Sequence, residues 1–237
     1  PPRSTLFPYT TLFRSVKGAD IDTASFGSAA TYWNNKGYGI NVVIGNQGKV
    51  REKIEQIITP LGGFYFEFGG RHYLNPSDPY AASYGHIENE FVKFVISRRS
   101  WEDTINDIKA TFTEESKDFT ERTAVVQNAA SVNLLGKVLT KTYDLTLFRT
   151  LGATQKRISE LIKSESYPYA EVEFTTNLKY ADLNEGMIVD LTNTKLGIVN
   201  ASFRIIRKNY ENIDSNEIIF NGVQVVESLF DDKWVNI

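Results

Sequence analysis

The chain has 237 residues, of which 41% are hydrophobic and 23% charged, and it contains no cysteine, one methionine and two histidines. This composition excludes disulfides, cysteine-based metal sites, thiol catalysis and a three-histidine metal site within one chain, so neither a metal nor a cofactor is predicted. The formal charge of -3 indicates no bulk affinity for nucleic acid, no apolar run reaches the roughly 18–20 residues of a membrane helix, and the 13% aromatic content favours β-rich structure.

The N-terminal residues 1–15 stand apart from the rest of the chain. They read Pro-Pro-Arg-Ser-Thr-Leu-Phe-Pro-Tyr-Thr-Thr-Leu-Phe-Arg-Ser and resemble the conceptual translation of a short-read sequencing adapter. Such a segment is set aside before the fold is considered. Its removal takes away two arginines and no acid, which changes the formal charge from -3 to -5. We therefore expect residues 1–15 to be artefactual and the natural protein to extend further upstream.

The segment that follows predicts two helices and a hairpin. Residues 16–36 have a weakly helical spacing, and residues 49–61 place apolar side chains at i, i+4, i+7 and i+8, which is typical of an amphipathic helix. Two β-rich runs within residues 64–74 flank Gly69-Gly70. Because a tight primed turn needs positive φ, Gly69 and Gly70 are predicted to be structural turn residues.

The remainder of the chain is dominated by strand patterns. The clearest is the alternation of Ala170, Val172 and Phe174 with polar residues. One helix is predicted at about 150–164, and the small-residue segment 128–136 is interpreted as a connection. Further strands are predicted at 90–96, 105–112, 119–127, 137–147, 187–191, 201–207 and 217–226. The fold class is therefore α+β and β-rich, with a small α+β domain at 16–85 and a β-rich domain at 86–237.

No residue pattern typical of an enzyme is present, and no catalytic residue is predicted. The chain has no phosphate-binding glycine-rich loop of the Walker type, no HExxH and no GxSxG. A cell-wall hydrolase is a minor alternative, in which Glu114, Glu115 and His86 would take part. Adjacent carboxylates diverge on a regular element, whereas glycoside hydrolysis needs two carboxylates that converge across a cleft.

Two further patterns leave binding functions open. Exposed aromatic side chains that gather on one surface can stack against sugars. The candidates for such a surface are Tyr80, Tyr84 and Trp101. A local basic cluster comprises Arg204, Arg207 and Lys208, with Tyr210 nearby. A nucleic-acid groove would need such clusters to merge on a chain that is acidic overall.

Short motifs follow one another in a defined order through the C-terminal part. They are Thr142–Asp144, a helix at Ala153–Leu161, a strand at Tyr169–Phe174, the glycine turn Leu183–Asp190, the strand Ser202–Ile206 and the final strand Glu217–Phe220. This order resembles the phage tail-tip and baseplate-hub family. Met187 departs from the family, which most often has Asp after the turn glycine, Gly186. The helix and hairpin of residues 50–74 are similar to the small domain that precedes the hub barrel.

The resemblance implies an antiparallel β-barrel-like hub domain with one packed helix, and it makes Gly186 a structural turn residue. It also implies a structural virion component of the tail tip or baseplate hub, located in the phage tail. Such a protein would be a homotrimer that links the tail tube to the host-adsorption apparatus and contacts the tape measure and the receptor-binding tip. DNA would pass through the ring without specific binding, because like charge on the wall repels it. A host-receptor or glycan-binding tail module is the alternative.

Overall fold

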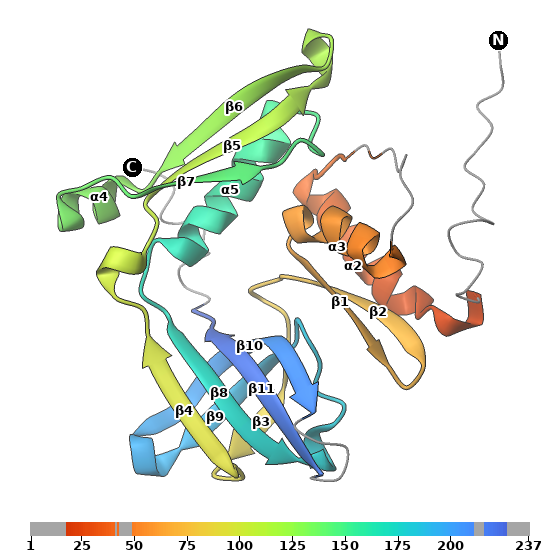
Figure 1. Cartoon of the computed structure of the whole chain (residues 1–237), viewed down its shortest axis with the longest axis vertical. Helices are drawn as coiled ribbons and strands as arrows, with labels where there is room; N and C mark the ends of the chain where they lie inside the picture. Colours follow the sequence, from red (N-terminus) through yellow and green to blue (C-terminus); the bar gives the residue numbers. More distant parts are fainter. Residues whose placement is uncertain (1–17, 41, 43–48, 211–215, 227–237) are drawn as a thin grey trace.

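The computed structural model describes residues 18–40, 42, 49–210 and 216–226 of the chain. Residues 1–15, with their adapter-like sequence, lie outside the described residues. The fold is α+β and rich in β-structure, which confirms the predicted class. Figure 1 shows two sheet-containing ends with a helix-and-hairpin unit beside them.

The helix-and-hairpin unit contains the predicted N-terminal elements. Helix α2 contacts strand β2, and helix α3 contacts strand β1. The Asp22 carboxylate caps α2 by accepting a hydrogen bond from the Ser25 backbone N–H at 2.8 Å. The elements are η1 (Gly18–Asp20), α2 (Thr23–Lys36), α3 (Val50–Leu61), β1 (Gly63–Phe68) and β2 (Arg71–Pro76).

A six-stranded sheet forms one end of the molecule. Its strands are β3 (Ser83–Glu88), β4 (Lys93–Arg98), β8 (Ala170–Asn177), β9 (Ile188–Asn193), β10 (Ile198–Tyr210) and β11 (Glu217–Gln224). Their order is β3-β9-β10-β11-β8-β4. All pairs are antiparallel except β3 with β9, which is parallel. In Figure 1 the sheet curls, with β4, β8 and β11 in front of β9 and β3.

A three-stranded sheet with one helix on it forms the other end (Figure 1). Its strands are β5 (Asp107–Glu114), β6 (Thr120–Gln127) and β7 (Thr140–Asp144), in the order β6-β5-β7, and α5 (Leu151–Glu165) packs against β5 and β6. A short helix, α4 (Ala129–Leu135), lies between β6 and β7. The remaining short turns are η2 (Trp101–Asp103), η3 (Glu115–Lys117), η4 (Leu178–Tyr180) and η5 (Thr194–Leu196).

Two hydrophobic cores stabilise these parts. The first joins the helix-and-hairpin unit to α5 and its sheet, with Trp33 and Leu74 from the unit meeting Phe112, Phe148 and Ile158. The second lies inside the curled sheet. There Phe94, Phe174 and Phe220 share one register row across β4, β8 and β11, with ring centroids 6.4 Å and 5.2 Å apart. Cross-strand aromatic pairs of this kind stabilise a sheet and fix its register. The division into domains at 16–85 and 86–237 stays a prediction.

Three features differ from the sequence expectation. The expected barrel is an open sheet among the described residues, because no pairing joins its end strands β3 and β4. Its predicted antiparallel character fails at β3, a strand the sequence did not predict, which pairs in parallel with β9. The connection at 128–136 contains α4, which begins at an Asn128 cap and ends at Gly136 with φ 66°. The packed helix is present as α5 but lies on the three-stranded sheet.

Candidate functional site

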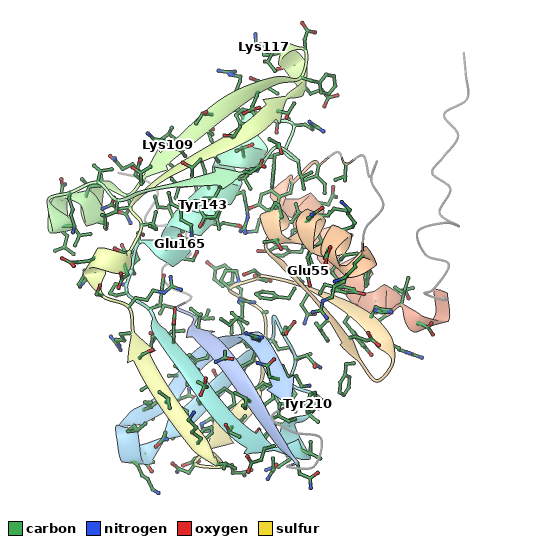
Figure 2. All side chains as sticks on the ribbon, viewed as in Figure 1. Glu55, Lys109, Lys117, Tyr143, Glu165 and Tyr210 are labelled. Carbon is green, nitrogen blue, oxygen red and sulfur yellow. The ribbon has the colours of Figure 1, made fainter. Side chains whose placement is uncertain are left out.

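The best-defined site is a joint where the hairpin β1–β2, helix α5 and the six-stranded sheet meet. It encloses a groove of about 280 Å³. The side chains that line the groove include Phe64 from β1, Arg157, Glu160 and Glu165 from α5, and Arg204 from β10. Figure 2 labels Glu165 at the end of α5 nearest the six-stranded sheet. We call this region, together with the adjoining β8–β9 connection at 178–187, the joint.

Arg204 is the buried cation of the joint. It is 7% exposed and stands on β10 between the buried side chains of Phe203 and Ile205. Its guanidinium donates hydrogen bonds to the carbonyl oxygen of Gly186 at 2.9 Å and to that of Asp78. Burial lowers the pKa of Arg204 to about 10, so the side chain is still charged at neutral pH. The two bonds connect the segment after β2 and the β8–β9 connection to β10.

A second polar cluster connects the helices. The Glu160 carboxylate of α5 accepts a hydrogen bond from the Tyr38 hydroxyl at 2.7 Å and forms ion pairs with Lys36 at 2.8 Å and Arg157 at 3.6 Å. Arg157 also donates through Nε to the carbonyl oxygen of Pro60 at 2.7 Å. Burial, and then the Glu160 charge, raises the pKa of Tyr38, so its hydroxyl stays a donor. The ends of α2 and α3 are thereby attached to α5.

Gly186 lies where the β8–β9 connection packs closely against the hairpin. Its φ is 85°, and its N–H donates to the carbonyl oxygen of Ile205 at 2.8 Å. A Cβ added there would lie 2.8 Å from Cβ of Asn75 and 2.9 Å from Cδ2 of Phe64. The Asn75 amide donates to the carbonyl oxygen of Glu185 at 3.1 Å. The position therefore requires both positive φ and the absence of a side chain.

Lys208 reaches into the same connection from β10. Its ammonium donates to the carbonyl oxygen of Ala181 and, at 2.8 Å, to Oδ1 of Asn184. It lies 5.1 Å from the ring centroid of Phe68 and 5.6 Å from that of Tyr210. Burial lowers the pKa of Lys208, against the opposing charges of two nearby carboxylates.

The carboxylates of the groove are engaged in contacts within the chain. Glu165 forms an ion pair with Lys141 at 3.0 Å and accepts a hydrogen bond from the Tyr143 hydroxyl, a pair that Figure 2 labels. Glu160 is held by the contacts described above. In the part of the chain that the structure describes, no three acidic or histidine side chains gather as metal ligands. The arrangement is that of a structural connection in which paired charges hold three parts of the chain together.

Most of the joint lies in a part of the chain that matches a known protein family. The family described as "Putative phage tail protein" matches residues 75–207, more than half of the chain. The chain belongs to this family of phage tail proteins. The matched range includes Asn75, Arg157, Gly186 and Arg204, so most of the joint lies inside it. The predicted relationship to phage tail proteins and the predicted location in the virion tail are therefore confirmed.

Two solved structures with similar folds are a tail protein and a chain of a virion particle. The tail protein from Neisseria meningitidis MC58 is similar with a TM-score of 0.54 at 13% identity, over 85% of this chain and 65% of that one. A chain in the virion of a native gene transfer agent particle is similar with a TM-score of 0.55 at 14% identity, over 79% of this chain. The chain described here spans 41% of the gene transfer agent chain. A search of curated proteins finds no match.

The three predicted surface aromatics of this chain have different surroundings in the structure. All three are exposed. Tyr84 is the second residue of β3, and its hydroxyl donates a hydrogen bond to the Asp182 carboxylate. Tyr80 lies in the segment before that strand. Trp101, in η2, packs edge-on against Tyr167 with ring centroids 6.3 Å apart. The glycan-binding alternative, which needs the three on one surface, gains no support from these contacts.

The residues of the hydrolase alternative lie in different parts of the fold. Glu114 ends β5 and pairs with Arg122, whose hydrogen bond, and then its charge, lowers the pKa of the Glu114 carboxyl. Glu115 begins η3 just after it. His86 is on β3 of the six-stranded sheet, where Nε2 lies 2.8 Å from the Thr192 hydroxyl. This arrangement does not bring the three side chains to one cleft.

Sequence reasoning found the turns of the tail protein more readily than its joint. Gly69 and Gly70 lie between β1 and β2 with φ of 58° and 74°. The basic cluster predicted at 204–208 is divided by the fold, since Arg204 is buried, Lys208 is half-buried and Arg207 is exposed. A charged residue between two apolar strand residues was the available signal for a buried arginine.

None of the helices in the described part of the chain has the length and apolar character of a membrane span.

Proposed function

We propose that this tail protein is a structural, non-catalytic component of the tail tip or baseplate hub, which links the tail tube to the host-adsorption apparatus. The family match and the fold shared with a chain of the gene transfer agent virion support a structural role in the tail. The hub role depends on one observation. Strands β3 and β4 end the six-stranded sheet and have no further partner strand in the described chain.

The free edges suggest how copies assemble. An edge strand exposes unpaired N–H and C=O groups, which proteins cover by pairing or by assembly. Strand β4 also carries Val95, which is 47% exposed. The pairings make β3 and β4 run in the same direction, so β4 of one copy can pair in parallel with β3 of the next. Repetition of this contact closes a ring, and we propose a homotrimer.

The proposed ring contacts other tail proteins and conducts DNA. Its partners in this proposal are the tail tube, the tape measure and the receptor-binding tip. The formal charge of the chain is -3, so DNA is repelled rather than held by a wall of this character. A gel-shift assay at low salt is expected to show no retardation of DNA, and tight DNA binding would contradict this part of the proposal.

Light scattering on the purified chain tests the assembly. We expect the mass of three copies, and Val95→Lys is expected to yield monomers because it places a charge on the β4 edge. The matched control is Leu134→Lys in α4, which is 67% exposed and lies between β6 and β7 of the three-stranded sheet. A monomeric parent chain, or equal dissociation by both variants, would refute assembly through β4.

Immunogold labelling of virions tests the position in the particle. Antibodies against the chain are expected to mark the end of the tail distal to the head. Label along the tail shaft, or on the head, would reject the tip or hub role while leaving membership of the tail protein family intact.

Two remaining proposals concern the chain itself. We propose that residues 1–15 derive from adapter and that the domains divide near residue 85. Long-read sequencing of the source would test the first, and the same read would show whether tail genes and a long tape-measure-like frame lie beside this gene. Limited proteolysis followed by mass spectrometry would test the second, with cleavage expected between residues 77 and 90.

A further inference from the structure

We propose that Lys208 and Asn184 form an intramolecular isopeptide bond, which would fasten strand β10 covalently to the β8–β9 connection. The proposal goes beyond the hub role and does not depend on it. It rests on the contacts of one lysine, one asparagine and their neighbours at the joint.

The two reacting groups are already in contact. Nζ of Lys208 lies 2.8 Å from Oδ1 of Asn184. The electrophilic carbon of that amide is one C=O bond, about 1.23 Å, beyond this oxygen. Asn184 is 4% exposed, and its Nδ2 donates to the backbone carbonyl of Asp182 at 2.8 Å, which fixes the plane of the amide. Such fixed proximity replaces a collision between free groups and greatly raises the reaction rate.

The amine must lose a proton before it can react, and its surroundings contain aromatic rings and carboxylates. The rings of Phe68 and Tyr210 lie 5.1 Å and 5.6 Å from Nζ. Burial lowers the pKa of Lys208, although the charges of Asp182 and Glu185 oppose this shift. The negative charges of these two carboxylates favour the protonated amine. The Glu185 carboxylate also accepts a hydrogen bond from the backbone N–H of Lys208 at 3.4 Å. A carboxylate near an amine can accept its proton and thereby turn the amine into a nucleophile.

The reaction balances without an oxidant or another reagent. A carboxylate, which we assign to Asp182, takes a proton from the Lys208 ammonium. The neutral Nζ attacks Cγ of Asn184 and forms the new C–N bond. The carboxyl group returns its proton to Nδ2 as the original C–N bond breaks. The same carboxylate then takes the second proton from the attacking nitrogen and passes it to the departing ammonia, which leaves as ammonium. The product is a secondary amide between the two side chains.

The other described lysine contacts differ from this arrangement. Six lysines form ion pairs with glutamates, namely Lys36, Lys49, Lys93, Lys137, Lys141 and Lys179. Lys53 also reaches an amide oxygen, that of Gln56, but at 3.5 Å on the exposed side of α3. That pair lacks the burial and the aromatic neighbours, so it serves as an internal comparison in which no bond is expected.

Intact-mass spectrometry of the purified chain tests the proposal directly. The expected mass is lower than the sequence mass by one ammonia molecule. Proteolytic digestion is expected to give a branched peptide that joins the segment around Asn184 to the segment around Lys208. Lys208→Arg should abolish both signals, whereas Lys53→Arg should keep both. Asp182→Asn should slow the appearance of the branched peptide by roughly 100-fold, the contribution of one general acid–base group.

Three outcomes would overturn the inference. A full-length mass with two unlinked peptides after prolonged incubation means that Lys208 is only a hydrogen-bonding contact. If the mass loss of one ammonia persists in Lys208→Arg, the ammonia comes from another site, and the Asn221-Gly222 dipeptide would be examined first. A branched peptide that contains Lys53 instead would show that burial does not select the lysine. Circular dichroism checks that Lys208→Arg is folded, and Asn184→Ser provides a second variant that cannot react.

Discussion

Replacement of Gly186 by alanine tests whether the joint is held by a close backbone contact. The residue has φ of 85°, a conformation that costs an alanine about 1–2 kcal/mol. The new Cβ would also lie 2.8 Å from Cβ of Asn75 and 2.9 Å from Cδ2 of Phe64. Neither atom is the far end of a flexible side chain, so the hairpin must move, and overpacking of this kind costs about 1–3 kcal/mol. We expect Gly186→Ala to lower the free energy of unfolding by about 2–5 kcal/mol.

Gly197 provides the matched control. Its φ is 69°, and no atom lies within 4 Å of the Cβ that an alanine would add. Gly197→Ala should therefore lower the free energy of unfolding only by the cost of placing an alanine in the left-handed backbone conformation, about 1–2 kcal/mol. Urea denaturation followed by tryptophan fluorescence measures both variants. If Gly186→Ala destabilises no more than Gly197→Ala, the contact with the hairpin has no energetic weight and the reasoning about the joint is refuted.

Further variants test other contacts of the fold. Arg204→Met leaves two buried carbonyl oxygens without their donor and should cost about 2 kcal/mol in urea denaturation, whereas the exposed Arg207→Met should stay within about 0.5 kcal/mol. The pKa of Tyr143 is raised to about 12, first by burial and then by Glu165, so its hydroxyl stays neutral in the folded chain above pH 10, where the unfolded chain ionises. The stability it contributes is therefore complete below about pH 10 and declines up to about pH 12, and Tyr143→Phe should remove that part of the decline in an alkaline stability series. Asn128→Ala removes the cap of α4 and should cost about 1 kcal/mol, seen as faster hydrogen exchange in α4; unchanged exchange would contradict the capping role.

The elements that sequence reasoning found are those with a local signal. Strand β8 alternates buried Ala170, Val172 and Phe174 with less buried glutamates, as its period of two predicts. Helix α5 begins at Leu151, after the N-cap Thr150, whose hydroxyl accepts a hydrogen bond from the Ala153 backbone N–H at 3.3 Å. Period and capping both depend on residues a few positions apart, so they can be recognised in a single sequence.

The elements that were missed depend on distant partners or very short signals. Strand β3 has no regular alternation, and it is a strand because it pairs with β9, about one hundred residues away in the chain. Helix α4 has seven residues and little burial, although Asn128 and Gly136 carried a start and a stop signal. Strand-pairing partners at long range cannot be read from local periodicity.

The joint was predictable only in part for the same reason. The turn at Gly186 could be predicted from its glycine, but its contact with Phe64 and Asn75 spans more than one hundred residues. Arg204 was interpreted as part of a basic cluster. A register shift between Ile205 and Arg207 breaks simple alternation along β10, so the spacing of the basic residues alone did not separate the buried Arg204 from the exposed Arg207.

The route of the chain through its two sheets has a consequence for how such proteins vary. Arg98 ends β4 directly opposite Ala170, the first residue of β8, so residues 99–169 leave the six-stranded sheet and return to it at neighbouring points. A segment whose ends lie side by side can lengthen, shorten or be exchanged as a unit without altering the strand order around it. One face of this segment is constrained, because Phe148 meets the Tyr38 ring at a centroid distance of 5.5 Å. Diversity among related tails is therefore expected to accumulate at the far tip of β5 and β6, while changes at Phe148 and Tyr38 should occur together.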